Sequence, residues 1–201
     1  MNTELEVVRV RSEEEAHETM DRMLEEGTLD GAVTMHYNFP IGVSTVGRVI
    51  TPGKGKKMFV ANTTGTSSIN RVAAMVKNII AGIGVAKTCG IKNPPVGILN
   101  IEGVRQVERV LKQLEENGYP LDFAESARSD GGFVMRGNDL LLGVPIVMTV
   151  DSLTGNVLMK IFSAFSSGGD YEALGYGYGP GVGEGFVIEL SVFYQEPVAP
   201  M

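Results

Sequence analysis

The feature that most constrains the fold is a strand-to-helix run between Ile146 and Phe165. Residues 146–150 form an unbroken apolar run rich in β-branched side chains, which predicts a strand buried on both faces. Small and polar residues follow at 151–156, and apolar side chains then recur at helical spacing. A strand, a polar turn and a helix make half of a βαβ unit, and ligands bind at the carboxyl ends of such strands. The turn at 151–156 is therefore the first candidate for chemistry.

Apolar runs and helical stripes alternate along the rest of the chain as well. This alternation predicts an α/β fold with a mainly parallel sheet flanked by helices, in a single domain spanning 1–201. We expect strands at 5–10, 29–35, 58–61, 95–101, 121–127 and 146–150, and an added strand from Phe186. We expect helices at 12–27, 40–50, 68–90, 104–118 and 157–165, the first opened by a capping box of Ser12 and Glu15. Residues 129–139 are expected to form an irregular loop.

The charge and the apolar content exclude several classes of protein. A formal charge of -7 and the lack of a dense Lys/Arg stripe argue against nucleic acid or an anionic membrane as a partner. No apolar run approaches the roughly 18 residues of a membrane-spanning helix, and the first residues lack a signal-peptide pattern. We therefore expect no membrane span and a cytoplasmic location.

The cysteine and histidine content limits the disulfides, nucleophiles and metal sites that the chain can form. One cysteine, Cys89, excludes an internal disulfide framework. It lies near the predicted end of a helix, where the negative end of the helix dipole opposes a thiolate, so a structural thiol is favoured over a nucleophile. Two histidines and one cysteine without ligand spacing give no reason to expect a metal.

Polar residues follow four of the predicted strands, and the carboxyl ends of parallel strands share one edge of a sheet. The clusters are His36 and Asn38; Asn62, Thr63, Thr64, Thr66 and Ser67; Asn100 and Glu102; and Asp151 and Ser152. Hydroxyls and free backbone N–H groups at helix starts suit an anion. For any one hydroxyl, ordinary N-capping is favoured over ligand contact, and only the convergence of the clusters favours a ligand site.

Other side chains extend the candidate list. Arg48, Arg128 and Arg136 have the forked geometry that binds phosphate, although surface ion pairing explains each of them alone. His36 is a candidate general base because an imidazole titrates near neutrality; a structural role is the alternative. No Walker A loop is present, and the glycine-rich segment 175–185 is a weak match to a dinucleotide-binding fingerprint, so no cofactor is expected.

Four runs in one order carry a family resemblance: L-D-G-A-V-T, P-I-G-V-S-T-V-G-R-V, G-I-K-N-P-P-V-G-I-L-N-I-E-G and V-D-S-L-T-G-N-V-L-M-K. Through them, about residues 5–185 resemble the phosphate acyltransferases of fatty acid and phospholipid synthesis. The chain looks closer still to the alpha subunits of component C of glycine/sarcosine/betaine reductase complexes. That closer resemblance rests on H-Y-N-F-P-I-G-V-S-T-V-G-R-V-I-T-P, S-D-G-G-F-V-M-R-G-N-D-L-L and G-Y-G-Y-G-P-G-V-G-E-G.

The resemblance implies a three-layer α/β/α fold like that of isocitrate and isopropylmalate dehydrogenases, which phosphotransacetylases share. It implies transfer of an acyl group from a thioester to inorganic phosphate, giving an acyl phosphate such as acetyl phosphate. The implied partners are inorganic phosphate, a protein-bound or carrier-bound acyl thioester, and other subunits of a reductase complex. Related folds commonly pair through helices, so we also expect a homodimer. A non-catalytic subunit of the same fold is the alternative.

By position in the shared runs, the resemblance assigns functional residues. Asp151 would orient or deprotonate phosphate, Asn100 would contact the acyl carbonyl, and the turn from Ser152 would hold phosphate or the developing oxyanion. The full set of candidates is Asp151, Ser152, Asn100 and His36 for catalysis, and Thr64, Thr66, Ser67, Arg128, Arg136, Thr154, Gly155, Asn156 and Lys160 for binding.

The chain departs from the family at both ends. Family members are longer on the N-terminal side, and the reductase subunit is expected to hold its acyl group on a cysteine nearer its C-terminus. The sequence after Gly185 no longer resembles the family, so we expect a shortened chain with a divergent tail at 186–201.

Overall fold

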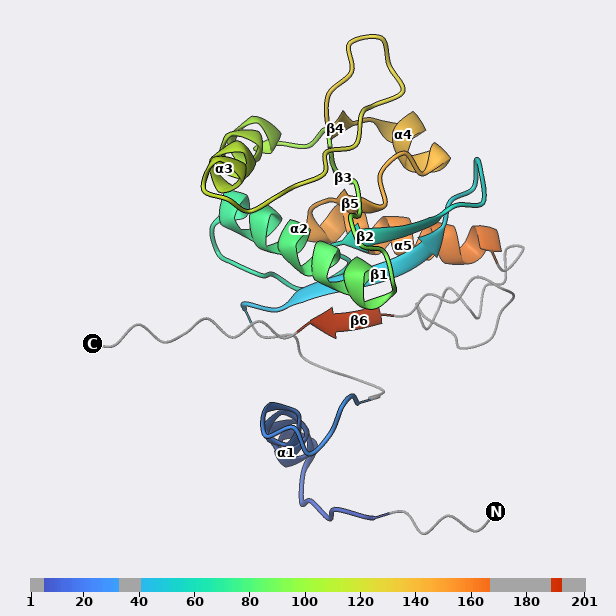
Figure 1. Cartoon of the computed structure of the whole chain (residues 1–201). Helices are drawn as coiled ribbons and strands as arrows, with labels where there is room; N and C mark the ends of the chain where they lie inside the picture. Colours follow the sequence, from blue (N-terminus) through green and yellow to red (C-terminus); the bar gives the residue numbers. More distant parts are fainter. Residues whose placement is uncertain (1–5, 33–40, 167–188, 193–201) are drawn as a thin grey trace. The chain divides into compact units, whose positions relative to one another are not determined.

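The computed structural model of the chain describes residues 6–32, 41–166 and 189–192 (Figure 1). Two compact units are distinguished, Met1–Asn38 and Phe39–Met201. The first contains one described helix, α1 (Glu13–Glu25), and the second contains the sheet. In these described ranges, no helix is both long enough and apolar enough to cross a membrane.

Helix α1 begins at the predicted capping residue. The Ser12 hydroxyl oxygen accepts a hydrogen bond from the Glu15 amide at 3.1 Å, and the Glu15 carboxylate accepts one from the Arg11 amide at 2.7 Å. The Glu15 side chain thus reaches one residue further back than an ideal capping box requires. No residue of α1 is buried.

In the described part of the second unit, six strands form one mixed sheet in the order β4-β3-β5-β2-β1-β6. Neighbouring strands are parallel from β4 to β2 and antiparallel from β2 to β6. The bounds are β1 (Ser44–Ile50), β2 (Lys57–Ala61), β3 (Val96–Leu99), β4 (Val134–Met135), β5 (Val147–Thr149) and β6 (Glu189–Val192). The mainly parallel α/β sheet is confirmed, and β6 confirms the strand expected after Phe186.

Helices cover both faces of this sheet (Figure 1). They are α2 (Arg71–Thr88), α3 (Val104–Glu116), α4 (Gly137–Leu142) and α5 (Ser152–Ser166). A Cβ added at Gly82 of α2 would lie 3.2 Å from Ala61 Cβ, whereas one added at Gly47 of β1 would lie 2.4 Å from Met159 Cε of α5. Ala61 pairs with Val46, and adjacent strand residues point to opposite faces. Therefore α2 and α5 pack on opposite faces, and α3 packs beside α2.

The core lies between the sheet and these two helices. Among the described residues, its largest fully buried side chains include Met58, Phe59, Ile79, Met148 and Met159. The apolar stripes predicted for α2 and α3 are confirmed in part. Met75, Ile79 and Ile83 of α2 and Val104, Val107 and Leu111 of α3 are buried, whereas Asn78, Gly82, Val85 and Ala86, which are buried as well, lie outside the predicted stripe of α2. The outer side of α5 carries the exposed apolar residues Leu153, Val157, Ile161 and Phe165.

The helix expected at 40–50 is wrong, because this segment contains β1. Val43, Val46 and Val49 suggested a helical stripe. However, β1 lies between two strands and is covered by helices on both faces, so its side chains are buried on both faces and lose the alternation typical of a half-exposed strand. The β-branched residues favour the strand once both faces are covered. The turn at 52–55 follows it, closed by a 2.8 Å hydrogen bond from the Gly55 amide to the Thr51 carbonyl.

Two strands expected in the first unit are not found among its described residues. Residues 6–10 are exposed and outside any strand, since β-branched side chains do not make a strand without a pairing neighbour. Residues 29–32 are also outside any strand, and 33–35 lie outside the described residues. The amides of Thr28 and Leu29 instead bond the Met23 carbonyl at the end of α1, at 2.9 and 3.2 Å.

The shorter strand expected at 121–127 reduces to one bridge, between Phe123 and Val96. β4 pairs with the rest of that edge of β3, which leaves no room for a longer strand. The residues 129–139, expected to be irregular, supply β4 and the start of α4.

Candidate functional site

A cleft of about 310 Å³ opens at the carboxyl ends of β2 and β5. It is lined by Asn62, by residues 65–69 and Arg71, by the inner side of α2 as far as Asn78, and by residues 150–152. β2 and β5 are parallel neighbours, with Ala61 paired to Thr149, so the segments that follow them leave the sheet side by side. Two of the four predicted polar clusters therefore meet in one cleft.

Asn62 holds the loop after β2 in place. Only 2% of its surface is exposed, and its Oδ1 accepts hydrogen bonds from the amides of Thr45 and Thr64, both at 3.2 Å. Its Nδ2 donates to the Gly65 carbonyl at 3.0 Å. The side chain thus binds both β1 and the loop it begins, so the loop is held by fixed polar contacts.

The loop then leads into α2. Asn70 caps this helix by accepting a 3.0 Å hydrogen bond from the Ala73 amide, and the Ser67 hydroxyl donates to the Ala74 carbonyl at 3.0 Å. Ser67 is predicted to bind phosphate, with a structural role as the alternative. Its hydrogen bond to the Ala74 carbonyl is the kind of contact that the structural role predicts. Thr66 also lines the cleft, whereas Thr64 is not among its lining residues and bonds the Thr45 hydroxyl through its amide at 2.8 Å.

Asp151 and Ser152 form the opposite wall. The segment predicted as a polar turn is shorter than expected, because α5 already begins at Ser152. The Asp151 carboxylate accepts hydrogen bonds from the Thr154 amide at 3.0 Å and the Thr154 hydroxyl at 2.7 Å, as a helix-capping residue does. Burial disfavours ionisation of Asp151, but these hydrogen bonds and the positive charge of Arg71 outweigh it and hold the pKa of Asp151 below its usual range.

Gly155 lies behind this wall and not in it. A Cβ at this position would be 1.8 Å from the Asn62 carbonyl oxygen and 3.0 Å from Val150 Cγ2. The first turn of α5 therefore packs directly on the backbone of the loop after β2. The absence of a side chain at Gly155 allows the two walls of the cleft to approach each other.

Arg71 was not among the predicted site residues, but it lines the cleft. Its guanidinium group forms an ion pair with Glu102 at 3.3 Å, and its side chain is 49% exposed. It is the first residue of α2, directly after the predicted polar cluster, and this position was the signal that could have identified it. Glu102 belongs to the cluster predicted after β3, so this ion pair connects that cluster to the mouth of the cleft.

The remaining predicted residues lie elsewhere. Asn100 is exposed at the end of β3, along the same edge of the sheet, and its amide donates to the Met135 carbonyl at 2.8 Å. Thr154, Asn156 and Lys160 are on α5, and none of them lines the cleft. His36 and Asn38 lie outside the described residues.

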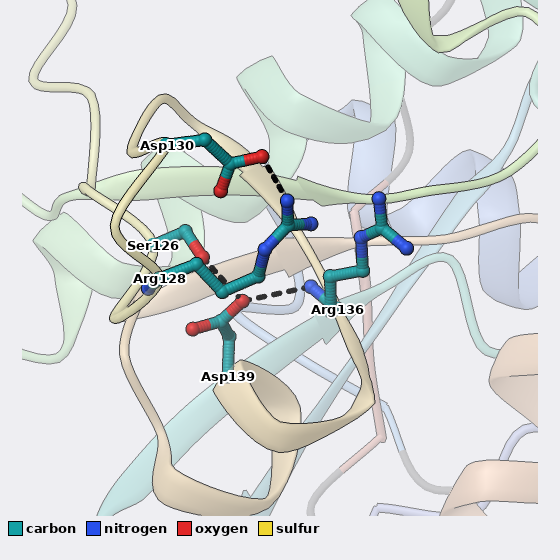
Figure 2. A network of polar contacts seen from close by, with 5 residues as sticks. All are labelled: Ser126, Arg128, Asp130, Arg136 and Asp139. Carbon is teal, nitrogen blue, oxygen red and sulfur yellow. Dashed lines mark hydrogen bonds and ion pairs between the residues drawn. The ribbon is translucent and has the colours of Figure 1, made fainter.

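Arg128 and Arg136 belong to a separate polar network around Asp139 (Figure 2). Arg128 forms an ion pair with Asp130. The fully buried Asp139 accepts hydrogen bonds from the Ser126 hydroxyl and the Arg136 amide, both at 2.8 Å. Neither arginine lines the cleft, and the ion pair with Asp130 agrees with the surface-pairing alternative for Arg128.

The same network sets the charge of Asp139. Burial disfavours its ionised form, but hydrogen bonds from the Arg136 and Ala127 amides and the Ser126 hydroxyl, with the nearby charge of Arg128, lower the pKa of Asp139 below its usual range. The ionised carboxylate thus fixes the loop 126–136 against the start of α4.

The described residues contain no group of three His, Cys, Asp or Glu side chains that could hold a metal ion. Cys89 is exposed and caps the C-terminal end of α2, where its amide donates to the Val85 carbonyl at 3.1 Å. This position agrees with the predicted helix end.

Comparison with known proteins gives a family match and several similar proteins. The family described as Fatty acid synthesis protein matches residues 2–189. The chain is 63% identical over 202 residues to the glycine/sarcosine/betaine reductase complex component C subunit alpha of Peptoclostridium acidaminophilum, covering 99% of this chain and 52% of that protein. These matches confirm the resemblance drawn from the sequence.

More distant relatives are phosphate acyltransferases. The protein from Acetivibrio thermocellus is 30% identical over 129 residues, which are 61% of this chain and 34% of the relative. The protein from Thermosipho melanesiensis is 31% identical over 86 residues, which are 40% of this chain and 23% of the relative. The chain spans about half the length, or less, of the curated relatives it matches.

Proposed function

The chain belongs to the family described as Fatty acid synthesis protein, and on this premise we propose that it transfers an acyl group from a thioester to inorganic phosphate. We further propose that it does so with other subunits of a glycine/sarcosine/betaine reductase-type complex, on a three-layer fold of the isocitrate-dehydrogenase type. The names of its relatives support this proposal. The observation that carries it is the cleft in which the loop after β2, the start of α2 and the start of α5 converge.

The reaction makes clear demands on a protein. A phosphate oxygen attacks the thioester carbonyl carbon, the carbon–sulfur bond breaks, and the proton of hydrogen phosphate leaves with the thiol. The products are an acyl phosphate and a free thiol. The protein must hold a phosphate dianion, orient one of its oxygens towards the carbonyl, and stabilise the negative charge that develops on the carbonyl oxygen.

The cleft contains groups suited to the first two tasks. Arg71 supplies a guanidinium group at the mouth, and two long helices, α2 and α5, begin at its walls, where free backbone N–H groups favour an anion. The hydroxyls of Thr66 and Ser152 are on opposite walls. We assign these five groups (the Arg71 guanidinium, the N-termini of α2 and α5, and the hydroxyls of Thr66 and Ser152) to phosphate binding.

Asp151 suits orientation better than proton removal. Its lowered pKa makes it a weak base, and both its oxygens already accept hydrogen bonds from Thr154. Hydrogen phosphate at neutral pH carries a nucleophilic oxygen without prior deprotonation. We therefore propose that Asp151 fixes the start of α5 and, through charge repulsion, turns the bound phosphate towards the thioester.

The negative charge of Asp151 also favours a second candidate function. A carboxylate in the cleft weakens anion binding, which suits a subunit that keeps the fold and assembles with partners without catalysing the reaction. The 63% identical relative is named as a subunit of a complex. The two functions differ in one observable, the formation of acyl phosphate.

The deciding experiment incubates the protein with acetyl-CoA or an acyl carrier thioester and inorganic phosphate, and detects acyl phosphate directly by phosphorus NMR. We expect the product with the wild-type chain and a loss of at least about tenfold in Asp151→Asn and Ser152→Ala. Arg71→Gln should also lose activity, whereas Arg105→Gln is the matched control, because Arg105 forms a surface ion pair with Glu108 on α3. Full activity in both Asp151→Asn and Ser152→Ala would refute the assignment, and no product at all would favour the non-catalytic subunit.

A further inference from the structure

Asn78 stands out among the residues of the cleft because it is both polar and deeply buried. It lies on α2 and lines the cleft, although only 3% of its surface is exposed. Burying an amide is costly unless its donors and acceptors are satisfied. Such a residue at the floor of a cleft needs a partner for each of its polar groups.

One half of the Asn78 amide has such a partner. Oδ1 accepts a hydrogen bond of 2.7 Å from the hydroxyl of Ser44, which is itself 3% exposed at the start of β1. This bond fixes the plane of the amide and the orientation of its two ends. No hydrogen bond joins the Nδ2 group to another described residue, and Nδ2 is not among the fully buried unpaired atoms of the described residues, so it retains accessible surface. Because Asn78 lines the cleft, its two donor hydrogens are available there.

The position of Asn78 separates it from the anion-binding groups. It follows Arg71 by seven residues on the same helix, which corresponds to roughly 10 Å along the axis. Arg71 is half exposed at the mouth, while Asn78 is at the buried end beside the apolar Met75 and Val150. The cleft therefore has a charged mouth, and Asn62, Ser67 and Asn78 are the polar side chains among its deeply buried lining residues. Asn62 Nδ2 and the Ser67 hydroxyl already donate to backbone carbonyls, which leaves Asn78 Nδ2 as the neutral donor available there.

A neutral donor in apolar surroundings suits a carbonyl oxygen better than a phosphate dianion, which requires charge compensation. We propose that Asn78 Nδ2 donates a hydrogen bond to the carbonyl oxygen of the acyl group, and that Ser44 is the positioning residue that holds the amide for it. This inference rests on the proposed function. It adds a carbonyl-binding subsite, distinct from the phosphate subsite, at the floor of the cleft.

The test uses two stable phosphonates of similar size. Acetonylphosphonate carries a ketone where an acyl phosphate has its carbonyl, and propylphosphonate lacks it. Calorimetric titration should show that the wild-type protein prefers acetonylphosphonate by about 2- to 10-fold, the range expected for one neutral hydrogen bond. In Asn78→Leu this preference should vanish while the affinity for propylphosphonate is retained. Arg71→Gln should weaken both ligands and keep their ratio.

Ser44 provides a second route if Asn78→Leu does not fold. Ser44→Ala removes the hydroxyl that orients the amide and should reduce the preference for acetonylphosphonate, and Ser44→Thr, which keeps a hydroxyl, should restore it. Equal binding of the two phosphonates by the wild-type protein, or a preference that persists in Asn78→Leu or in Ser44→Ala, would overturn the inference.

The outcomes separate this inference from the proposed function. Acyl phosphate formation without an Asn78-dependent preference would overturn the carbonyl subsite and leave the transfer reaction standing. An Asn78-dependent preference without acyl phosphate formation would support the subsite and refute the catalytic role. Binding of neither phosphonate, together with no acyl phosphate formation, would overturn both.

Discussion

Replacement of Gly155 by alanine gives a sharp test of the structure, because two general effects predict opposite changes in the free energy of unfolding. In an ordinary helix, alanine is more favourable than glycine by about 1 kcal/mol, so the change should stabilise the protein. At Gly155, however, the new Cβ would lie 1.8 Å from the Asn62 carbonyl oxygen and 2.9 Å from its carbonyl carbon. Backbone atoms cannot rotate away as the end of a flexible side chain can.

The expected magnitude follows from these contacts. Overpacking a well-packed site costs about 1–3 kcal/mol, and a contact with a fixed backbone carbonyl belongs at the upper end of this range. Subtracting the helix-propensity gain of about 1 kcal/mol leaves a net loss of about 2 kcal/mol. For a domain of this size, that loss lowers Tm by roughly 4–8 °C.

Urea unfolding followed by circular dichroism measures the effect, with Gly84→Ala as the matched control. Gly84 is also within a helix, α2, but a Cβ there would meet no atom within 4 Å, so this variant should gain up to about 1 kcal/mol. A Gly155→Ala protein as stable as the wild type, beside a stabilised Gly84→Ala protein, would refute the packing of α5 on the loop after β2. Because that loop lines the cleft, Gly155→Ala should also weaken phosphate binding.

Three further predictions test other parts of the molecule. Asp139→Asn should lower the free energy of unfolding by about 2–3 kcal/mol at neutral pH, because an amide cannot accept all three hydrogen bonds that Asp139 accepts. Because the pKa of Asp139 is depressed in the folded state, its contribution to the free energy of unfolding is complete above about pH 4 and is lost as the pH falls through the folded-state pKa. In a pH series of urea titrations, the stability of the variant should therefore fall less steeply at acid pH than that of the wild type. An equally steep fall would contradict this. Thr149→Val should leave the free energy of unfolding unchanged or raise it by about 1 kcal/mol, because the buried Thr149 hydroxyl has no hydrogen-bond partner among the described residues. A clear loss of stability in thermal unfolding would show that this hydroxyl does have a partner. Asp151→Asn removes a negative charge from the cleft and should therefore tighten the binding of inorganic phosphate by up to about fivefold at low salt. Unchanged or weaker binding, measured by calorimetry, would contradict the binding of an anion in the cleft near Asp151.

The sequence predicted well those elements whose burial leaves a simple pattern. The runs at 58–61, 95–101 and 146–150 are strands, and the stripes of α2 and α3 are helices, because each has apolar residues at a period that only one secondary structure explains. The pattern misled at 40–50, where burial on both faces removes the alternation of a strand. It also missed β4, whose two residues are too few to carry a period.

The candidate site was predicted in part for the same reason. Thr66, Ser67, Asp151 and Ser152 were found because polar residues at the ends of apolar strands are conspicuous, and parallel pairing of β2 with β5 does bring them into one cleft. Arg71 and Asn78 were missed because both belong to a helix, where polar residues are ordinary. Arg128 and Arg136 were selected for their chemistry alone, and the structure places them in another network.

Periodicity and local order along the chain were enough to predict the α/β class, the family and the edge of the sheet at which the cleft lies. Which polar residues share the cleft could be learned only from the three-dimensional structure, because that depends on which strands are neighbours and on how closely two segments can approach. The turn after β5 is an example. Its residues suggested ligand contacts throughout, yet Gly155 packs on the Asn62 carbonyl, Thr154 bonds Asp151, and of residues 152–156 only Ser152 lines the cleft. Close packing between distant segments of the chain, which leaves no trace in local sequence, made that distinction.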